Sequence, residues 1–444
     1  MSRLILGHTT DTTAKIWIRA SQRWPVAFVQ LINPTNDKKL DEISIQTQEP
    51  EFFTAVHEFN GLTADTDYKI KVAFAKSLKD PPEARIREAY TKGRFKTFPK
   101  TNKQPFTFLL GSCNLHSLGV LEKPDESWLT ISRVAAKTQA RFMIHAGDQI
   151  YADIPLKPEA SLEHYRDKYL DAWDDCVPAK QVLTELPHYM ILDDHEIIND
   201  FENDRGGVGS TLPRIALKAY WEFQHSHNPL TLGAPDQYYY SFNYGDVQFF
   251  VLDTRTARIS SLNQMIDDKQ LKSLLAWMTQ YKNNTKFIVT SVPFVGVVKN
   301  PGQDKWCSPA YTAQREKILG HILKNGISNV VFLTGDMHTS YCADMEISDN
   351  NGNRVVIQEL MSSPINQFTP DWPLEFYYEP PKPESNGGLQ YKSTIRKNSY
   401  YGAHSNVMSI TVTSGQPIEF GIYRTTKDLF KPATSIRPAI KGKL

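Results

Sequence analysis

The stretch Phe142-Met143-Ile144-His145-Ala146-Gly147-Asp148-Gln149-Ile150-Tyr151 says most about the fold of this chain. It begins with a short, nearly continuous apolar run, which is typical of a β-strand covered on both faces. Gly147 and Asp148 then end the run with a polar turn. In an α/β sheet, polar residues just past the carboxyl end of a strand face the binding crevice. The stretch therefore predicts a buried strand that presents Asp148 and Tyr151 to a functional site.

The same kind of apolar run recurs along the second part of the chain. Further runs span Phe106–Leu110, Tyr189–Leu192, Val247–Leu252, Phe287–Val289 and Val330–Leu333. Helical patterns lie between several of them, at Trp128–Thr138, Leu212–Gln224, Gln270–Tyr281 and Thr312–Leu323. Strands that alternate with helices predict an α/β domain whose sheets are covered by helices.

The first 98 residues have a different pattern, with period two. Ala14–Arg19 and Tyr68–Phe74 alternate, which predicts half-buried antiparallel strands. The segment Leu62–Tyr68 resembles the tyrosine corner of immunoglobulin-like and fibronectin-like sandwiches. We therefore predict an N-terminal β-sandwich domain over residues 1–98, a linker over 99–105 and a catalytic domain over 106–444.

Length, charge and cysteine content limit the function classes. A chain of 444 residues is too long for one ordinary core, so two domains are expected. With 50 basic and 49 acidic residues, the net charge of +1 argues against nucleic-acid binding through bulk electrostatics. The net charge does not exclude a local basic patch. The four cysteines are widely spaced without a CxxC pair, and we expect them to be reduced.

Hydropathy gives an expectation about location. No apolar run approaches the roughly 18 residues that span a bilayer. The N-terminus reaches polar residues too soon for the apolar region of a signal peptide. We therefore expect no transmembrane segment and a cytoplasmic protein, unless a leader has been removed.

Four predicted strands end in reactive residues. The strand-end motifs are Gly111-Ser112-Cys113-Asn114, Gly147-Asp148-Gln149-Ile150-Tyr151, Asp193-Asp194-His195-Glu196 and Gly335-Asp336-Met337-His338. Crowded carboxylates repel unless cations neutralise them, and hard cations favour oxygen ligands. A phenolate and a thiolate beside an imidazole suit a more Lewis-acidic ion such as Fe(III) or Zn(II). The mixture predicts two adjacent metal ions with different ligand preferences.

These motifs, in this order, resemble those of the PhoD-type alkaline phosphatases, within the calcineurin-like metallophosphoesterase superfamily. The resemblance extends to Ala14–Arg19, Gly93–Phe98, Tyr240–Asp246, Leu252–Arg255 and Gln314–Leu319, so it covers almost the whole chain. It implies an α/β fold, namely a four-layer α/β/β/α sandwich preceded by an immunoglobulin- or fibronectin-like β-sandwich.

The resemblance also implies a set of metal ligands. They are Cys113, Asp148, Tyr151, Asp194, Asp336 and His338. Asp148 would bridge the two metals. Cys113, Tyr151 and His338 would complete a site expected to hold Fe(III). The other two carboxylates would hold a second cation, expected to be Ca²⁺, with Zn²⁺ or Mn²⁺ as alternative metals.

Other residues are candidates for contact with the substrate. By resemblance, His195 would contact the phosphate or protonate the leaving oxygen. Arg255 and Arg258 could bind phosphate oxygens bidentately, although a solvated or structural arginine is the alternative. Asn114 could hydrogen-bond the phosphate or cap a turn. Asp193 is a further ligand or a partner of the ligands.

The predicted function is metal-dependent hydrolysis of small-molecule phosphoesters, either monoesters or diesters. Two metals would clamp the phosphate and generate a hydroxide that attacks in line. The alternatives are a phospholipase D-like phosphodiesterase and a catalytically inactive binding relative. A cysteine-dependent phosphatase generally needs an arginine six residues after its nucleophile, and Gly119 holds that position after Cys113. A serine hydrolase would show Gly-x-Ser-x-Gly, which the chain lacks.

Two late segments carry weaker expectations. Ser362–Asn366 is rich in turn residues and is expected to pack over the metal site, with an ordinary surface turn as the alternative. The basic tail Lys427–Leu444 is expected to be a solvated end or an edge that wraps back onto the fold.

Overall fold

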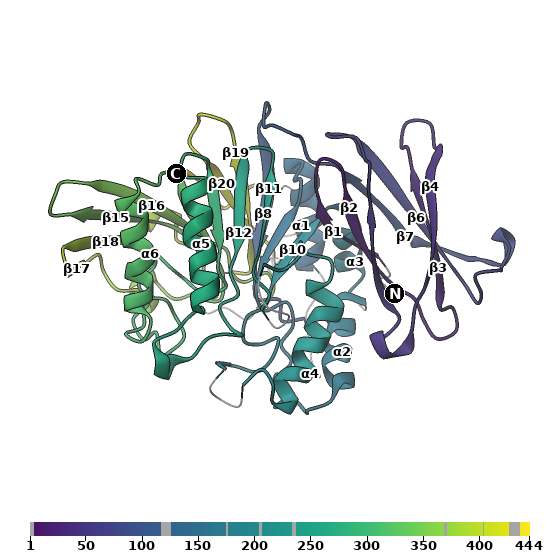
Figure 1. Cartoon of the computed structure of the whole chain (residues 1–444), viewed down its shortest axis with the longest axis horizontal. Helices are drawn as coiled ribbons and strands as arrows, with labels where there is room; N and C mark the ends of the chain where they lie inside the picture. The colour runs from purple at the N-terminus through teal and green to yellow at the C-terminus, as the bar shows by residue number, and fades with distance from the viewer. Residues whose placement is uncertain are drawn as a thin grey trace.

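The computed structural model has a mixed α/β architecture, and its described residues form four β-sheets (Figure 1). It describes residues 4–116, 126–174, 176–203, 207–232, 237–367, 371–402, 404–425 and 436–444. Within these ranges no helix is both long and apolar enough to cross a membrane.

The N-terminal strands form two small antiparallel sheets, seen at the right of Figure 1. The first has the order β1 (Leu4–Thr9), β2 (Ala14–Arg19), β5 (Thr54–Phe59). The second has the order β4 (Lys39–Gln46), β3 (Val26–Ile32), β6 (Asp67–Ala75), β7 (Ile86–Lys96). The antiparallel strands predicted from the period-two pattern are confirmed. The Tyr68 hydroxyl accepts a hydrogen bond from the Thr63 backbone N–H at 2.9 Å, the kind of contact that a tyrosine corner makes.

Two larger sheets follow. The six-stranded sheet has the order β10 (His188–Ile191), β9 (Met143–Ala146), β8 (Phe106–Gly111), β19 (Asn406–Val412), β20 (Glu419–Arg424), β21 (Ile440–Lys443). The eight-stranded sheet has the order β11 (Tyr240–Tyr244), β12 (Val247–Val251), β13 (Lys286–Val289), β14 (Val330–Thr334), β16 (Arg354–Met361), β15 (Tyr341–Asp349), β18 (Leu389–Ile395), β17 (Pro383–Asn386). Strands β8, β9 and β10 run parallel, as do β12, β13, β14 and β16. Each parallel group therefore directs its carboxyl ends to one edge.

Aromatic side chains join the two large sheets. Phe108 of β8 meets Phe249 of β12 and Phe287 of β13 edge to face, with ring centroids 5.5 and 5.2 Å apart. These rings are buried in one cluster that draws on both sheets. The sheets therefore pack face to face over an aromatic core.

Several helices pack against these sheets. The helices are α1 (Glu126–Thr138), α2 (Leu162–Tyr169), α3 (Val177–Glu185), α4 (Thr211–Tyr220), α5 (Asp268–Gln280), α6 (Thr312–Lys324) and α7 (Leu374–Tyr377). Trp128 of α1 and Val182 of α3 share a buried cluster with Leu109 of β8. Leu274 of α5 and Ile318 of α6 are buried with residues of the eight-stranded sheet.

The strands and helices predicted between residues 106 and 334 are confirmed, with ends that shift by a few residues. No strand was predicted from the sequence after Val330–Leu333, yet β15 to β21 lie there. Within β15, Ala343, Met345 and Ile347 are buried and alternate with the more exposed Asp344, Glu346 and Ser348, so the period-two signal of a strand was present in the sequence and was missed. In the basic tail, residues 427–435 lie outside the described ranges, and Ile440–Lys443 forms the edge strand β21.

The N-terminal sheets are tied to the rest of the chain by buried contacts. The indole N–H of Trp17 donates to the backbone oxygen of Glu222 at 2.6 Å, and Lys15 Nζ donates to that of Asn228 at 2.9 Å. Trp17 and Phe98 belong to the cluster that also fills the space between the two large sheets. The first 98 residues thus share a core with the later part of the chain.

Several buried histidines make stability depend on pH. Burial lowers the pKa of His8, His225 and His227 to about 3 and that of His188 to about 4. The folded state therefore keeps these rings neutral, whereas the unfolded chain protonates them near pH 6.5. The contribution of these neutral rings to stability is fully present above about pH 6.5. It is lost as the pH falls toward the lowered pKa values.

We expect the free energy of unfolding to decline between pH 7 and pH 5, with each buried ring contributing up to about 1.4 kcal/mol per pH unit. Urea denaturation of chelator-treated protein across this range measures the decline. The His225→Gln variant removes one titrating ring and should show a shallower decline than the parent. An equally steep decline in the variant would contradict this account.

Candidate metal centre

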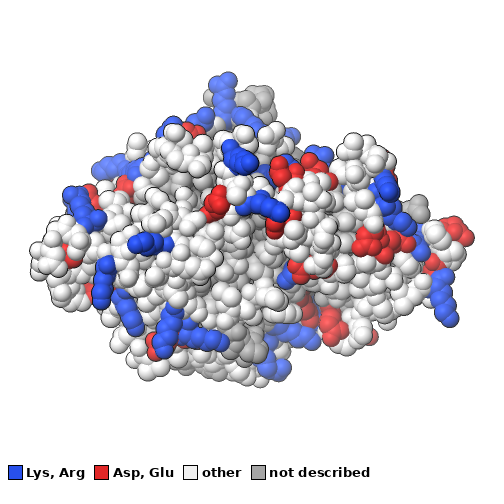
Figure 2. Space-filling model, turned by 45° about the horizontal axis from the view of Figure 1, so that its top comes forward, with Lys and Arg blue, Asp and Glu red and all other residues white. Residues whose placement is uncertain are grey.

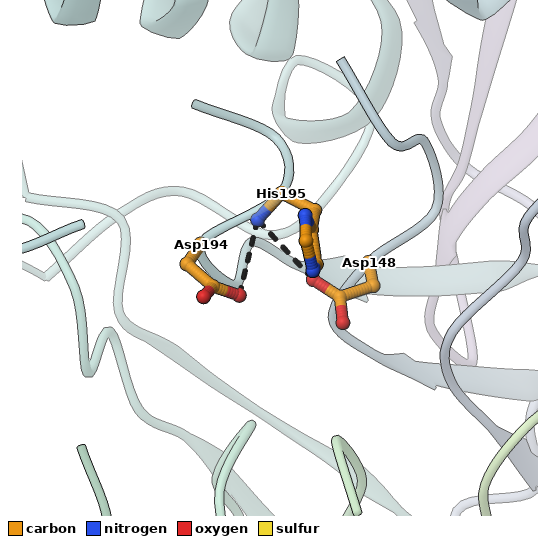
Figure 3. A group of neighbouring side chains, drawn as sticks. All are labelled: Asp148, Asp194 and His195. Atoms are coloured by element: carbon orange, nitrogen blue, oxygen red, sulfur yellow. Dashed lines mark hydrogen bonds between the residues drawn. The ribbon is translucent and has the colours of Figure 1, made fainter. Parts of the chain in front are cut away.

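The predicted metal ligands come from four strand-end loops. Cys113 follows β8, Asp148 follows β9, Asp194 follows β10 and Asp336 follows β14. Asp148, Asp194 and His195 bring ligand atoms within 4.8 Å of one another (Figure 3). The ligand atoms of Asp148, Asp193 and Asp336 meet the same limit. Asp148 belongs to both groups, which is the position a bridging carboxylate needs.

The backbone at these loops is unusual. Cys113, Asp148, Asp336 and His338 all have left-handed conformations, with φ of 58°, 53°, 74° and 52°. Such non-glycine residues cost on the order of 1–3 kcal/mol each and cluster at functional sites. The loops also approach closely, because a Cβ on Gly147 would lie 2.6 Å from the Cβ of Asp193.

A thiol, a phenol and an imidazole gather on one side of Asp148. The Cys113 thiol donates to Asp148 Oδ2 at 3.3 Å, and the Tyr151 hydroxyl lies 3.2 Å from His338 Nε2. Burial, followed by the nearby carboxylates Asp148 and Asp336, raises the pKa of the Cys113 thiol. Burial also raises the pKa of Tyr151. A bound cation would reverse both effects, because it favours thiolate and phenolate.

The pKa values of the carboxyl groups at the site are shifted in different directions. Burial raises the pKa of Asp148, although nearby His195 opposes that effect. Burial likewise raises the pKa of Asp336 to about 7. Burial also acts to raise the pKa of Asp194, but the positive charges of Arg255, His195 and Lys305 together outweigh it, and the net shift is downward.

His195 is oriented by a carboxylate. Its Nδ1 lies 2.7 Å from Asp153 Oδ1, and Asp153 Oδ2 accepts the Asn199 backbone N–H at 2.7 Å. The His195 backbone N–H points toward the carboxylates of Asp148 and Asp194 (Figure 3). Burial lowers the pKa of His195, but the carboxylates outweigh it and raise that pKa to about 10.

Three predicted substrate contacts interact with other residues of the protein. Arg255 is fully buried and ion-paired with Asp193 and Asp304, and Asp304 also pairs with Arg258. Asn114 is likewise buried. Its amide accepts from the Trp128 indole at 3.1 Å and donates to the backbone of Gln149 at 3.3 Å. Most of these polar groups have partners, which supports structural roles, although Nη2 of Arg255 and Nη2 of Arg258 are buried without a hydrogen-bond partner among the described residues.

The donor set fits metal ions. Asp193 Oδ2 is buried and has no hydrogen-bond partner among the described residues, although its other oxygen pairs with Arg255. A buried carboxylate oxygen without a partner is costly unless a cation meets it. The thiol, phenol and imidazole on one side and the carboxylates on the other match ions of different hardness.

Comparison with known proteins assigns a family. A family model described as PhoD-like phosphatase matches residues 108–414. The chain belongs to this family. Alkaline phosphatase D of Bacillus subtilis (strain 168) is 25% identical over 301 residues, which are 57% of this chain and 50% of that protein. The chain thus matches about half the length of that curated relative.

The solved structure of PhoD matches with a TM-score of 0.74 and 18% identity. The match covers 100% of this chain and 91% of the other. At this identity the match speaks for the fold alone. It agrees with the resemblance to PhoD-type phosphatases in the strand-end motifs.

Glu196 received no role from the sequence, although it lies in a quoted motif. Its buried carboxylate accepts the backbone N–H groups of Asp148, Gln149 and Asp193 at 3.0, 2.5 and 2.8 Å. Gln224 Nε2 donates to it at 2.9 Å. Glu196 therefore ties together the two loops that carry the central carboxylates.

Lys305 and Asp304 are further residues of the centre that the sequence did not indicate. Lys305 forms ion pairs with Asp304 and with Asp336. Both residues precede α6 and lie outside every strand-end motif, so no local signal marked them. Asp153, two residues after the motif that ends at Tyr151, also received no role from the sequence.

The segment Ser362–Asn366 lies against the centre. Ser363 Oγ donates to the Cys113 thiol at 3.2 Å and accepts the His338 backbone N–H at 3.1 Å. The Asn366 backbone N–H donates to the Cys113 carbonyl at 3.2 Å. The expectation that this segment packs over the predicted site agrees with these contacts.

The role of Glu196 can be tested by Glu196→Gln. A glutamine keeps the volume but replaces an accepting oxygen by an amide that cannot accept, so a buried backbone N–H loses its partner. We expect the free energy of unfolding to fall by about 2–3 kcal/mol. Urea denaturation measures this change. Glu346→Gln, at an exposed ion pair with Arg354, should change stability by less than about 0.5 kcal/mol. Equal effects of the two variants would refute the role of Glu196.

Proposed function

We propose that this member of the PhoD-like phosphatase family is a metal-dependent hydrolase of phosphoesters. The observation that carries the proposal is Asp148, which belongs to both groups of converging ligand atoms. Cys113, Tyr151 and His338 beside it add the softer donors of a second kind of metal site. Family membership supports the same reaction class.

The residues divide into two proposed metal positions that share Asp148. Cys113, Tyr151 and His338 would hold the more Lewis-acidic ion, Fe(III), with Zn²⁺ as an alternative. Asp194 and Asp336 would hold a hard cation, Ca²⁺, with Mn²⁺ as an alternative. When bound, such ions would polarise the phosphate and activate water near neutral pH.

The remaining side chains would position these groups and move a proton. The contact of His195 Nδ1 with Asp153 leaves Nε2 available to donate a proton to the leaving oxygen. Arg255 and Asp304 would hold Asp193 and Asp194 in place through buried ion pairs. We therefore assign Arg255 a positioning role. The same reasoning places Asn114, through Trp128, among the supports of the Cys113 loop.

We also propose the finer description of the fold. The face-to-face sheets and the helices outside them support a four-layer α/β/β/α sandwich over residues 106–444. The two N-terminal sheets support an immunoglobulin- or fibronectin-like sandwich over residues 1–98, with the linker at 99–105.

The proposal is tested by assaying a chromogenic phosphate monoester and the matching diester, each with and without a chelator. Chelator-sensitive turnover that returns when metal is restored is the expected result. The ratio of the two rates would then separate a monoesterase from a diesterase or phospholipase D-like enzyme. No turnover of either ester by fully metallated protein would refute general phosphoester hydrolysis and favour a binding relative.

The roles of Asp148 and His195 predict different variant phenotypes. Asp148→Asn should lose bound metal and activity together, because it removes the charged oxygen shared by both positions. His195→Ala should keep its metal and lower kcat by about 10²–10⁴-fold, the usual contribution of general acid catalysis. Elemental analysis and steady-state kinetics on the same preparations measure both. Metal loss in the His195 variant would contradict the role given to it.

A further inference from the structure

A large groove lies where the second N-terminal sheet meets helices α1 and α3. Its volume is about 1440 Å³, and strands β6 and β7 form one wall while the two helices form the other. α3 contacts β7 directly, and α1 packs against α3 (Figure 1 labels all four elements). It is far larger than the hollow beside Trp17 and Trp173 and the one beside Asn114 and Tyr151, which have volumes of about 10 and 40 Å³.

The side chains that line the groove are strongly basic. The basic ones are Lys69, Lys71, Lys92, Arg94, Lys96, Arg133, Arg141 and Lys180. The acidic ones are Asp67 and Glu185. This excess contrasts with the whole chain, whose net charge is only +1. On the face drawn in Figure 2, by comparison, basic and acidic side chains are interspersed.

Strand register places like charges opposite each other on one wall. Lys69 pairs with Arg94 and Lys71 pairs with Lys92 across β6 and β7. Like charges directly opposite on a sheet are destabilising. Sequences usually avoid such conflicts, and those that persist tend to mark functional sites.

Several of these cations have no acidic partner. Within the described residues, no carboxylate lies within 4.0 Å of the charged groups of Lys71, Lys92, Arg94 or Arg133. The first three are exposed on the strand wall, and Arg133 is exposed on α1. Both walls therefore offer unneutralised positive charge to the same space.

The groove is separate from the metal centre. Its lining residues Leu186 and Pro187 lie just before β10, whereas Asp194 and His195 follow that strand. On α1, likewise, the lining residues precede β9, while Asp148 follows it. Groove and metal centre therefore lie at opposite ends of the parallel strands.

We propose that this groove is a second site, which binds a linear anion made of linked phosphate groups. Arginine forks take phosphate oxygens bidentately, and lysine binds phosphate as a point charge. Same-face residues repeat every two positions along a strand, roughly 6.6 Å apart, so the wall offers a regular row of cations. This site does not depend on the hydrolysis proposed above.

The lining favours a phosphate chain over a protein partner or base recognition. Protein interfaces depend on buried aromatic or large apolar anchors, and Val177 is the one exposed large hydrophobic residue in the groove lining. Phe95, the one aromatic lining residue, is buried, so bases would find no stacking surface. Inorganic polyphosphate and single-stranded nucleic acid should therefore bind alike, through their phosphates.

The test measures equilibrium binding of the full-length, metal-loaded protein to three fluorescent probes. The probes are inorganic polyphosphate, single-stranded oligodeoxythymidine and poly-glutamate of matched charge, each checked for integrity afterwards. We expect both phosphate chains to bind, and poly-glutamate to bind at least tenfold more weakly. If only one of the two phosphate chains binds tightly, the proposal of a phosphate-chain site still stands. The result would then show which of the two chains is the ligand.

A charge-reversed pair of lysines tests whether the groove is responsible. Lys71→Glu/Lys92→Glu should weaken phosphate-chain binding at least tenfold. It should also reduce the slope of log affinity against log salt by about 0.7 for each phosphate that the protein no longer neutralises. Lys269→Glu/Lys272→Glu, at exposed positions on α5, changes the net charge equally and should leave binding within about twofold. Neither pair should alter hydrolysis of a small chromogenic ester.

A single variant separates binding from folding. Lys92→Glu places a carboxylate opposite Lys71, so we expect a higher thermal midpoint together with weaker binding. Three results would overturn the proposal. They are unchanged binding in the groove variants, an equal loss in the α5 pair, and poly-glutamate binding as tight as that of the phosphate chains.

Discussion

The candidate centre depends on one buried carboxylate. Glu196 accepts the backbone N–H groups that open the Asp148 loop and the Asp193 loop, so two strand ends are held in one position. A charged acceptor is worth about 1.5–3 kcal/mol per hydrogen bond, enough to offset some of the strain in the left-handed loop residues. Asp148 and Asp193 have further partners in Cys113 and Arg255, but among the contacts described above it is Glu196 that joins the backbones of the two loops.

The eight-stranded sheet uses the same device. Glu359 of β16 is fully buried and accepts the backbone N–H groups of Phe294, Val295 and Gly296 at 2.7, 2.8 and 3.2 Å. The Tyr341 hydroxyl donates to it at 2.7 Å. This loop follows β13, so buried glutamates organise strand-end loops in both sheets. Buried carboxylates therefore have two uses in this fold. Some hold loop backbones in place, and others form the predicted metal positions.

The sequence predicted the strand ends well because a short apolar run followed by a polar turn is a local signal. It also grouped the residues that converge on Asp148, since carboxyl ends of parallel strands meet at one edge. It could not predict which polar side chains are already engaged. Arg255 and Asn114 contact Asp304 and Trp128, which lie 49 and 14 residues away in the sequence, and no local pattern marks these pairs. Lys305 lies outside every motif, and its place beside Asp336 follows from tertiary packing alone.

The left-handed backbone at the centre also restricts how this protein can change over evolution. Aspartate, asparagine and histidine tolerate that conformation better than most residues, which suits Asp148, Asp336 and His338. Cys113 is the exception, since cysteine has no such preference. Replacement of aspartate by asparagine would remove the charge but keep the loop conformation. Replacement by a β-branched residue would deform the loop, because such residues rarely adopt left-handed conformations. Relatives that lose chemistry at these positions can therefore keep the architecture, and the shape of the loops would outlast the activity.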